Sequence, residues 1–245
     1  MRLLLAGLMA VVVSAAIGCQ SNDPYRLGAA RGVVAYSLQA TGGLKTWQSV
    51  SRIHATAVVA SYDRDGGAHV DRMRLTIEPW GNHISASGQS PQGSWSASLS
   101  DNGPISVFGQ PSQARDTLRD ILASILHRTR GSLNLLDGSE KIASIDKASI
   151  AGEELTRVRV RGKNAQAAAY YFSTASKMLR YVTSGADEPG AKGTLTIFGQ
   201  GKEPYVRLGN GLVFPKSFRI VQIGQYVLPS DQMVLDVDLA DLRAE

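Results

Sequence analysis

The sequence has a single cysteine, Cys19, among its 245 residues. Without a second cysteine no intramolecular disulfide can form, so burial of apolar surface has to stabilise the fold. A strong excess of one charge is also missing, because 26 Lys and Arg against 21 Asp and Glu give a net charge of +5. So mild an excess does not indicate nucleic-acid binding and is compatible with a position near anionic lipid head groups. The 43% hydrophobic and 19% charged residues are typical of a folded globule.

Enzyme motifs are absent as well. There is no Gly-x-Ser-x-Gly motif, because Gly88–Gly93 encloses one residue too many, and there is no glycine motif for dinucleotides or phosphates. The four histidines, His54, His69, His83 and His127, lack the spacing of a zinc-protease helix. His54, His69 and His83 lie on separate expected strands, so a three-histidine metal site would require tertiary assembly. Asp63–Gly66 begins like a calcium loop but lacks the later glutamate, and it is ordinary hairpin-turn chemistry. We therefore predict a protein that is not an enzyme and holds no metal and no cofactor.

The first nineteen residues form an apolar leader. After Arg2, the run Leu3–Ile17 is nearly unbroken, but it is shorter than the stretch of about 20 residues that a transmembrane helix needs. The run ends in Ala16-Ile17-Gly18-Cys19, which resembles a bacterial lipobox with alanine in place of the usual leucine. The alternative is an ordinary secretory signal cleaved after Val13-Ser14-Ala15. We expect Cys19 to begin the mature chain and to carry covalent lipid, which excludes it as a catalytic thiol.

The lipobox divides the chain into three parts. Residues 1–18 are expected to be a lipoprotein signal peptide, residues 19–26 the lipidated N-terminus with a short tether, and residues 27–245 a single domain without internal repeats. The tether after Cys19 spans at most about 23 Å, so the domain should lie close to the membrane. Gln20 is not the aspartate that commonly retains lipoproteins in the inner membrane. The expected location is therefore the outer membrane, facing the periplasm.

Two amphipathic helices are expected in the domain. The first runs from about Leu27 to Thr41 and ends at Gly42 and Gly43. Its apolar face comprises Leu27, Ala30, Val34, Leu38 and Thr41. The second helix starts at Pro111 and Ser112 and ends at Gly131, and basic residues occupy its negative C-terminal end. Its apolar stripe comprises Leu118, Ile121, Leu122, Ile125 and Leu126.

Alternating apolar and polar residues predict strands over most of the remaining chain. Arg52–Ala60 and a run around Met73, Leu75 and Ile77 flank an Asp-Gly turn and predict a hairpin. Further strands are expected at His83–Ser87, Gly93–Ser100, Ile105–Phe108, Lys141–Ile150, Glu154–Arg161, Ala168–Ser173, Met178–Thr183, Thr194–Gly199, Ser217–Val227 and Met233–Leu239. Because an open flat sheet seldom holds so many strands, we predict a mainly β (α+β) fold. It would be a strongly curled antiparallel sheet or incomplete β-barrel of about ten or eleven strands with two covering helices.

Three short segments carry a family resemblance. Ala40–Trp47 leads into the first strand, Tyr170–Ser173 is an aromatic strand followed by Lys177–Arg180, and Gly211–Lys216 precedes a long strand. With the lipobox and this order of elements, the chain resembles the LolA/LolB-like superfamily of periplasmic lipoprotein carriers and receptors. Ser173 departs from the aspartate that relatives often have there. The resemblance implies an incomplete β-barrel with helices as a lid, an apolar cavity for acyl chains and no catalytic residue, and the lipobox favours a receptor-like, anchored arrangement.

The candidate cavity residues come from two strands and the second helix. They are Met73, Leu75, Ile77, Trp95, Leu99, Leu118, Ile121, Leu122, Ile125 and Leu126. The resulting hypothesis is a membrane-anchored periplasmic lipoprotein that binds a lipid or acyl chain, for lipoprotein reception or lipid transfer. Its partners would be the membrane, through the N-terminal lipid, and a lipid or lipoprotein. The alternative is a non-catalytic structural or interaction module of the cell envelope, in which the same apolar faces fill a core.

Arginines form a second candidate feature. Arg157, Arg159 and Arg161 alternate on one expected strand, and Arg72 and Arg74 lie on another. Guanidinium groups match phosphate geometry, so these residues could bind phosphate head groups or an acidic partner. A solvated outer face of the sheet is the alternative explanation of the same alternation.

Overall fold

The computed structural model describes residues 24–63, 67–100, 103–136, 140–161, 167–185, 193–199, 204–223 and 229–245. The helices within these residues are α1 (Pro24–Ala40), α2 (Leu44–Gln48), α3 (Arg115–Arg130) and α4 (Leu133–Leu136). The first strands are β1 (Ile53–Tyr62), β2 (Ala68–Glu78), β3 (His83–Ser90), β4 (Gly93–Ser100), β5 (Ser106–Phe108), β6 (Lys141–Ile150) and β7 (Glu153–Arg161). The others are β8 (Ala169–Ser173), β9 (Leu179–Ser184), β10 (Thr194–Phe198), β11 (Tyr205–Arg207), β12 (Val213–Pro215), β13 (Ser217–Ile223) and β14 (Pro229–Ala244).

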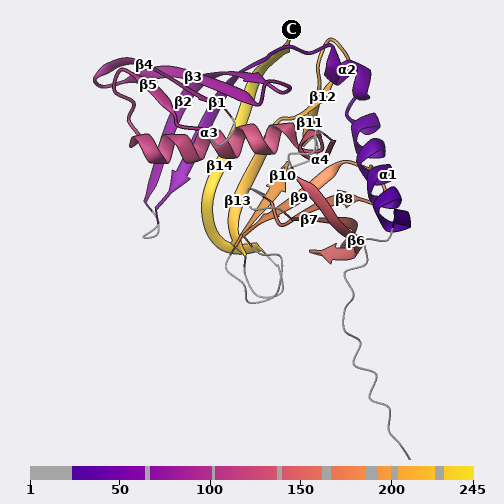
Figure 1. The fold of residues 1–245 in the computed structure, drawn as a ribbon. Coiled ribbons are helices and arrows are strands. Elements are labelled where there is room, and N and C mark those ends of the chain that lie inside the picture. Colours follow the sequence, from indigo (N-terminus) through magenta and orange to yellow (C-terminus); the bar gives the residue numbers. More distant parts are fainter. Residues whose placement is uncertain are drawn as a thin grey trace, which may run out of the picture.

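One antiparallel sheet of twelve strands dominates the molecule, in the order β5-β4-β3-β2-β1-β14-β13-β10-β9-β8-β7-β6 (Figure 1). Two runs of neighbouring hairpins form its two halves, and β13 and β14 join them. The long strand β14 pairs with β1 from Ile53 opposite Ala244 to Ser61 opposite Leu235. The last strand of the chain therefore lies beside the first, in the middle of the sheet. β11 and β12 form a separate two-stranded ribbon.

Alternation along the strands gives the sheet an inner, buried face. In β1, Ile53, Ala55, Ala57 and Val59 are buried, whereas the residues between them are not. α3 lies across this inner face and contacts β3 and β4, as Figure 1 shows. Apolar side chains recur every two residues along the strands and every 3.6 residues along α3, so each element has one apolar face. These two faces pack against each other and form one core.

α1 and the short helices border the other half of the sheet. α1 packs against β6, which is the edge strand there. A hydrogen bond of 2.8 Å between the hydroxyls of Ser37 and Ser132 links α1 to the segment that follows α3. α2 continues from α1 after Gly42 and Gly43, both with positive φ, and buries Trp47. Covering an edge strand with a helix protects its unpaired backbone groups from other chains.

Several expectations need correction. The fold is mainly β and antiparallel with covering helices, as predicted, but the main sheet has twelve strands rather than ten or eleven. The prediction of a strongly curled sheet or incomplete barrel is wrong: the sheet is open, and among the described residues β5 and β6 end it without pairing with each other. Helix α1 covers the β6 edge, and β5, at the other edge, has only three residues. Both features reduce the exposed edge that could pair with another chain, so the sheet does not need to close.

The boundaries of single elements also differ. α3 begins at Arg115, four residues after Pro111, and Trp47 lies in a helix rather than a connection. β14 extends beyond the expected Met233–Leu239 at both ends, and Asp241, with a φ of 53°, lies where its register with β1 shifts. The signal peptide, Cys19 and residues 20–23 of the tether lie outside the described residues, as do 64–66 of the expected hairpin turn. The domain boundary at residue 27 stays a prediction, although α1 begins before it.

Candidate functional site

The ten predicted cavity residues meet between α3 and the inner face of the sheet. All belong to one hydrophobic cluster, and none is more than 5% exposed. The stripe of α3 packs against β3 and β4, so side chains of this chain occupy the interface. An acyl chain could enter here only if α3 moved away from the strands. Their role as a ligand cavity therefore stays a prediction that requires this movement.

The C-terminal end of α3 carries a buried polar network that the sequence did not reveal. The basic residues expected to interact with the helix end are instead buried inside the domain. His127 Nε2 lies 3.0 Å from Glu140 Oε1, and Glu140 Oε1 also accepts the backbone N–H of Ala167 at 3.0 Å. Asn134 donates to the carbonyl of His127 at 2.9 Å and to the Tyr170 hydroxyl at 3.2 Å. Polar side chains from α3, α4, β8 and the residue before β6 thus bind each other inside the core.

The two neighbouring arginines complete this network. Arg128 donates from Nε to Thr196 Oγ1 and from Nη2 to Ser184 Oγ, each at 2.7 Å. Arg130 donates from Nε to the carbonyl of Pro79 and from Nη1 to Asn134 Oδ1, each at 2.8 Å. These hydrogen bonds to buried acceptor oxygens offset the loss of hydration that the guanidinium groups undergo on burial. The arginines therefore link α3 to both halves of the sheet.

Protonation states follow from this geometry. Arg128 Nη1, which can only donate, contacts His127 Nδ1. Nδ1 must then be the acceptor, so Nε2 carries the proton and donates it to Glu140. Burial lowers the pKa of His127 to about 4, against the opposing effect of the hydrogen bond to Glu140. Burial, the largest single effect, would raise the pKa of Glu140, but the hydrogen bonds from His127, Tyr170 and the backbone of Ala167 together with the charge interaction with His127 lower it below its usual value. The pair is thus a neutral imidazole with a carboxylate at neutral pH.

An apolar groove lies beside this network, between α1, α4 and the start of β6. Its volume is about 740 Å³. Its lining residues are Arg31, Val34, Ala35, Leu38, Gln39, Leu44, Leu135, Leu136, Glu140, Lys141 and Ile142. Leu44 and Leu136, which are 39% and 43% exposed, present apolar surface at this groove. We call this feature the α1–β6 groove. Val34 and Leu38 lay on the predicted apolar face of the first helix, but no local pattern indicated that this face would border a groove.

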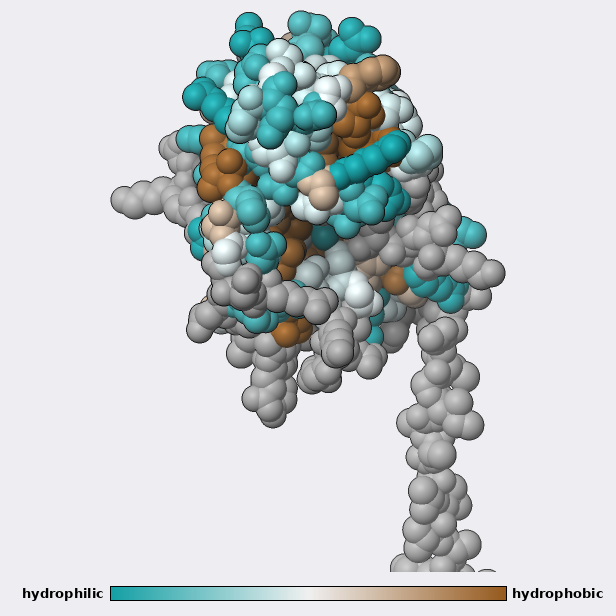
Figure 2. All heavy atoms as spheres, turned by 90° about the vertical axis from the view of Figure 1, so that its left-hand side faces the viewer, coloured by the Kyte–Doolittle hydropathy of each residue, from teal (hydrophilic) through white to brown (hydrophobic). Residues whose placement is uncertain are grey.

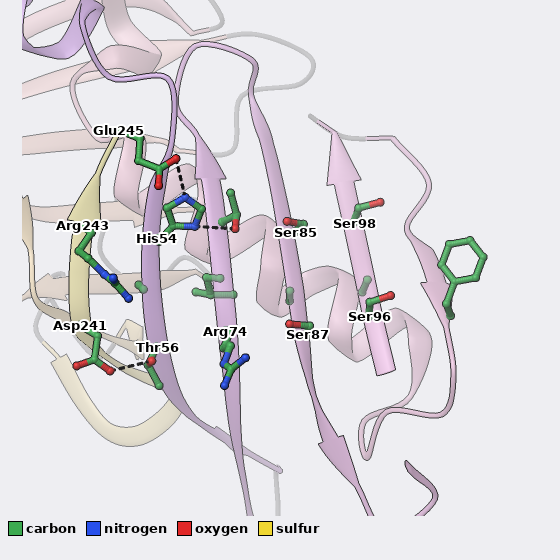
Figure 3. A pocket seen from close by; sticks show the side chains of 16 residues that line it. His54, Thr56, Arg74, Ser85, Ser87, Ser96, Ser98, Asp241, Arg243 and Glu245 are labelled. Carbon is green, nitrogen blue, oxygen red and sulfur yellow. Dashed lines mark hydrogen bonds and ion pairs between the residues drawn. The ribbon is translucent and has the colours of Figure 1, made fainter. Parts of the chain in front are cut away.

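A polar hollow occupies the outer face of β14 and β1–β5 (Figure 3), and we call it the polar trough. Its volume is about 830 Å³. Short side chains line its middle strands: Ser85 and Ser87 on β3, and Ser96 and Ser98 on β4. His54 is held between Thr76 Oγ1, at 3.1 Å, and Glu245 Oε2, at 3.3 Å. The serines alternate with the apolar residues that predicted these strands, so the period of two also accounts for this polar face.

The side of the molecule that carries β2–β5 has a mixed surface. Figure 2 shows hydrophobic patches there, separated by hydrophilic residues. Among the exposed apolar side chains, Phe108 on β5 is 74% and Val70 on β2 is 66% exposed. Phe108 also lines the polar trough.

The arginine row on β7 has partners within the sheet. Arg157 donates from Nε and Nη2 to the two carboxylate oxygens of Asp146 on β6, at 2.7 and 2.6 Å, and Arg159 Nη2 lies 4.0 Å from Asp146 Oδ2. The hydrogen bond to Asp146 raises the pKa of Arg157. Burial, the largest single effect, would raise the pKa of Asp146, but the hydrogen bond from Arg157 and the charges of Arg157 and Arg159 together lower it. These contacts use Arg157 and Arg159 to hold two strands together, whereas Arg72 and Arg74 lie on β2, in the other half of the sheet.

The described residues offer neither a metal-binding cluster nor a membrane-spanning helix. The described residues contain no group of three or more His, Cys, Asp or Glu side chains that could hold a metal ion. His54, His69 and His83 lie on β1, β2 and β3, and His127 lies in α3. In the part of the chain that the structure describes, no helix is long and apolar enough to cross a membrane.

Solved structures place the fold. No family model and no curated protein matches the chain. The crystal structure of a LolA superfamily protein from Nitrosomonas europaea has a TM-score of 0.57 and 9% identity over 88% of this chain and 93% of that one. The crystal structure of a putative outer membrane lipoprotein-sorting protein domain from Vibrio parahaemolyticus has a TM-score of 0.49 and 11% identity, over 91% of this chain and 93% of that one. The crystal structure of a DUF1329 family protein from Desulfovibrio piger has a TM-score of 0.46 and 10% identity, over 88% of this chain and 92% of that one.

The first of these similarities identifies the class of fold. Identities this low are informative about the fold alone, and only the Nitrosomonas europaea protein has a TM-score above 0.5. The domain therefore has a LolA/LolB-like fold, as the sequence resemblance predicted.

Proposed function

We propose that this protein is a lipid-anchored, non-catalytic protein of the bacterial envelope that binds an acyl chain of a lipid or lipoprotein in the α1–β6 groove. The observation that carries the proposal is an apolar groove of about 740 Å³ in a LolA/LolB-like fold. Its volume falls within the range of about 300–1,000 Å³ typical of small-molecule sites. Lipoprotein reception or lipid transfer at the outer membrane is the role that this binding would serve.

The groove suits an acyl chain better than the core below α3. Burial of each methylene group contributes about 0.8 kcal/mol, so even a partly enclosed chain is held firmly. Val34, Leu38 and Ile142 supply apolar walls, and the exposed Leu44 and Leu136 would be covered by the ligand. The groove also needs no displacement of α3, whereas a ligand among the predicted cavity residues does.

Charged residues at the groove fit the polar end of a lipid. Arg31 and Lys141 line it and are exposed. Lys and Arg side chains attract anionic lipid head groups, at about 1 kcal/mol for each near a membrane surface. The acyl chain would lie along the apolar walls, and its head group would lie against these two side chains.

The proposed anchor is close to this groove in sequence. α1 begins at Pro24, five residues after Cys19. An extended chain of five residues spans at most about 17 Å, so lipid on Cys19 would keep α1 near the membrane surface. The groove would then receive or release its ligand at that surface without a long excursion of the domain.

Filling the groove tests the proposal. Ala35 lines it and is exposed, so Ala35→Trp should occupy it without disturbing the core. Displacing about two methylene groups of a bound chain weakens affinity about tenfold. The measurement is titration of the full-length protein, in a detergent of short chain length, with a dansyl-labelled fatty acid.

The neighbouring residue offers a matched control. Tyr36 is 65% exposed on the same helix and does not line the groove, so Tyr36→Trp should leave the affinity within about twofold. The acyl-binding proposal fails if the unmodified protein does not bind the probe. A wild-type affinity in Ala35→Trp would place the ligand elsewhere, and the α1–β6 groove would be the wrong site.

A further inference from the structure

The polar trough has the layout of a second ligand site, separate from the α1–β6 groove. Strand register builds it from rows of side chains that cross the sheet. In one row, Arg74 lies opposite Thr56 on one side and Ser87 on the other, and Ser87 lies opposite Ser96. A row that begins with Arg243 and His54 continues in the same way through Thr76, Ser85 and Ser98. Both rows point to the outer face, away from α3.

The hollow results from the size of these side chains. Serines form the part of both rows on β3 and β4, whereas Arg74 and Arg243 lie toward the β14 end. Phe108 lies opposite Ser96 and ends the first row. Figure 3 shows Arg74 and Arg243 on either side of Thr56. Because neighbouring strands are about 4.8 Å apart, the six strands from β14 to β5 give a trough about 24 Å long. A ligand that fills it has to be extended.

The arginines of the trough have unused hydrogen-bonding capacity. Within the described part of the chain, no hydrogen bond or ion pair involves the side chain of Arg74 or Arg243. The four serine hydroxyls likewise have no partner among the described residues. By contrast, Asp241 accepts a hydrogen bond of 3.0 Å from Thr56. Donors are thus available along the whole trough, and fixed acceptors lie at its β14 end.

Charge balance selects the chemistry of the ligand. The lining contains the side chains of two arginines and of two carboxylic acids, Asp241 and Glu245, so the formal charges of these side chains cancel. A polyanion would gain from the arginines but be repelled by the carboxylates. Sugar hydroxyls both donate and accept, as serine and threonine hydroxyls do, and they can bind to either kind of charged group. The exposed ring of Phe108 adds an apolar surface for the C–H face of a sugar ring.

We propose that the polar trough binds a neutral saccharide chain, which lies across β14 and β1–β5 with its hydroxyl groups on the serines and its end at Phe108. This inference does not depend on acyl binding in the α1–β6 groove. It would give the protein a second contact within a polysaccharide-containing envelope, on the face of the sheet opposite α3.

Titration of the full-length protein with defined sugars tests the proposal. The probes are maltotetraose, cellotetraose and chitotetraose, with their disaccharides, tetragalacturonate and inorganic phosphate for comparison, measured by calorimetry and saturation-transfer NMR. At least one neutral tetrasaccharide should bind, and more tightly than its disaccharide, because the trough spans six strands. The proposal is overturned if no neutral tetrasaccharide binds, or if tetragalacturonate or phosphate binds more tightly.

Variants then locate the bound sugar. Arg74→Ala and Phe108→Ala alter exposed side chains and should each weaken binding about tenfold. Arg72→Ala is the matched control, because Arg72 is exposed on the same face of β2 two residues away but does not line the trough. Its affinity should stay within about twofold. Equal effects of Arg72→Ala and Arg74→Ala, or none from Arg74→Ala and Phe108→Ala, would place the sugar outside the trough.

Discussion

At the scale of residues, the network around His127 consists of buried polar side chains that form hydrogen bonds with one another. His127 is 6% and Glu140 4% exposed, and their hydrogen bond replaces the water that both groups lose on burial. The orientation of the imidazole follows from Arg128, which occupies its Nδ1 side. Glu140 also lines the α1–β6 groove, so the network supports the floor of the proposed acyl site.

This network predicts a loss of stability in acid. Unfolded His127 titrates near 6.5, whereas the folded protein keeps it neutral down to about pH 4. Between these values the unfolded chain binds more protons, so stability is full above pH 6.5 and decreases as the pH falls. Over a difference of about 2.5 units, at 1.36 kcal/mol each, the loss approaches about 3 kcal/mol. The lowered pKa of Glu140 acts in the same direction below its unfolded value of 4.5.

The corresponding experiment is urea unfolding between pH 7 and 5. His127→Gln should be less stable at pH 7 but should lose most of the dependence on pH, because no imidazole remains to titrate. His69→Gln is the control, because the His69 side chain is 60% exposed. This variant should leave the dependence of the unfolding free energy on pH unchanged. An unaltered slope in His127→Gln would show that another group causes the acid sensitivity.

At the scale of elements, α1 depends on the glycines that end it. Gly42 has a φ of 111°, and a Cβ there would lie 2.8 Å from the carbonyl oxygen of Gly211. The side chains that line the α1–β6 groove from this helix therefore owe their placement to a turn that only glycine fits well. Gly32, in the middle of the same helix, has open space around it.

These two glycines predict opposite effects of the same substitution. Gly42→Ala should destabilise the protein by more than about 1 kcal/mol, because alanine disfavours positive φ and meets a backbone atom. Gly32→Ala should stabilise it by about 0.5–1 kcal/mol, because alanine favours the helix. Thermal unfolding of both variants measures the difference, and a stable Gly42→Ala would contradict the requirement for glycine at this turn.

At the scale of the whole molecule, the two halves of the sheet have different surroundings. α3 covers the inner face of β1–β5, while the outer face of these strands carries the polar trough. In the half of the sheet that includes β6–β10 and β13, a second cluster of apolar side chains is buried, including Tyr171, Leu195 and Val221. The proposed acyl and saccharide sites therefore lie on separate parts of the molecule, and both could be occupied at once.

Anchoring is the prediction that belongs to this scale. If Cys19 carries lipid, Cys19→Ser should abolish the added acyl mass and move the protein from the membrane fraction to the soluble fraction. Mass spectrometry of the mature N-terminus distinguishes the alternatives. A chain that begins at Ala16 with a free thiol at Cys19 would instead indicate an ordinary secretory signal.

Much of the fold could be predicted from the sequence, but little of the site. Met73, Leu75 and Ile77 predicted a strand because side chains on a strand alternate between its faces, and Leu118 to Leu126 predicted α3 by helical spacing. His127, Arg128 and Arg130 were predicted only to suit the negative C-terminal end of the helix. Their partners, such as Thr196 and Glu140, are too distant in sequence for any local pattern to connect them.

The sequence by itself determined the antiparallel strands, the two long helices and the LolA/LolB-like order of elements, because each depends on residues close together along the chain. Only the tertiary structure decided that β14 pairs with β1, that the sheet stays open, and that α1 borders β6 with a groove between them. The same holds for the rows of the polar trough. These features depend on the register between distant strands, which periodicity along a single strand does not specify.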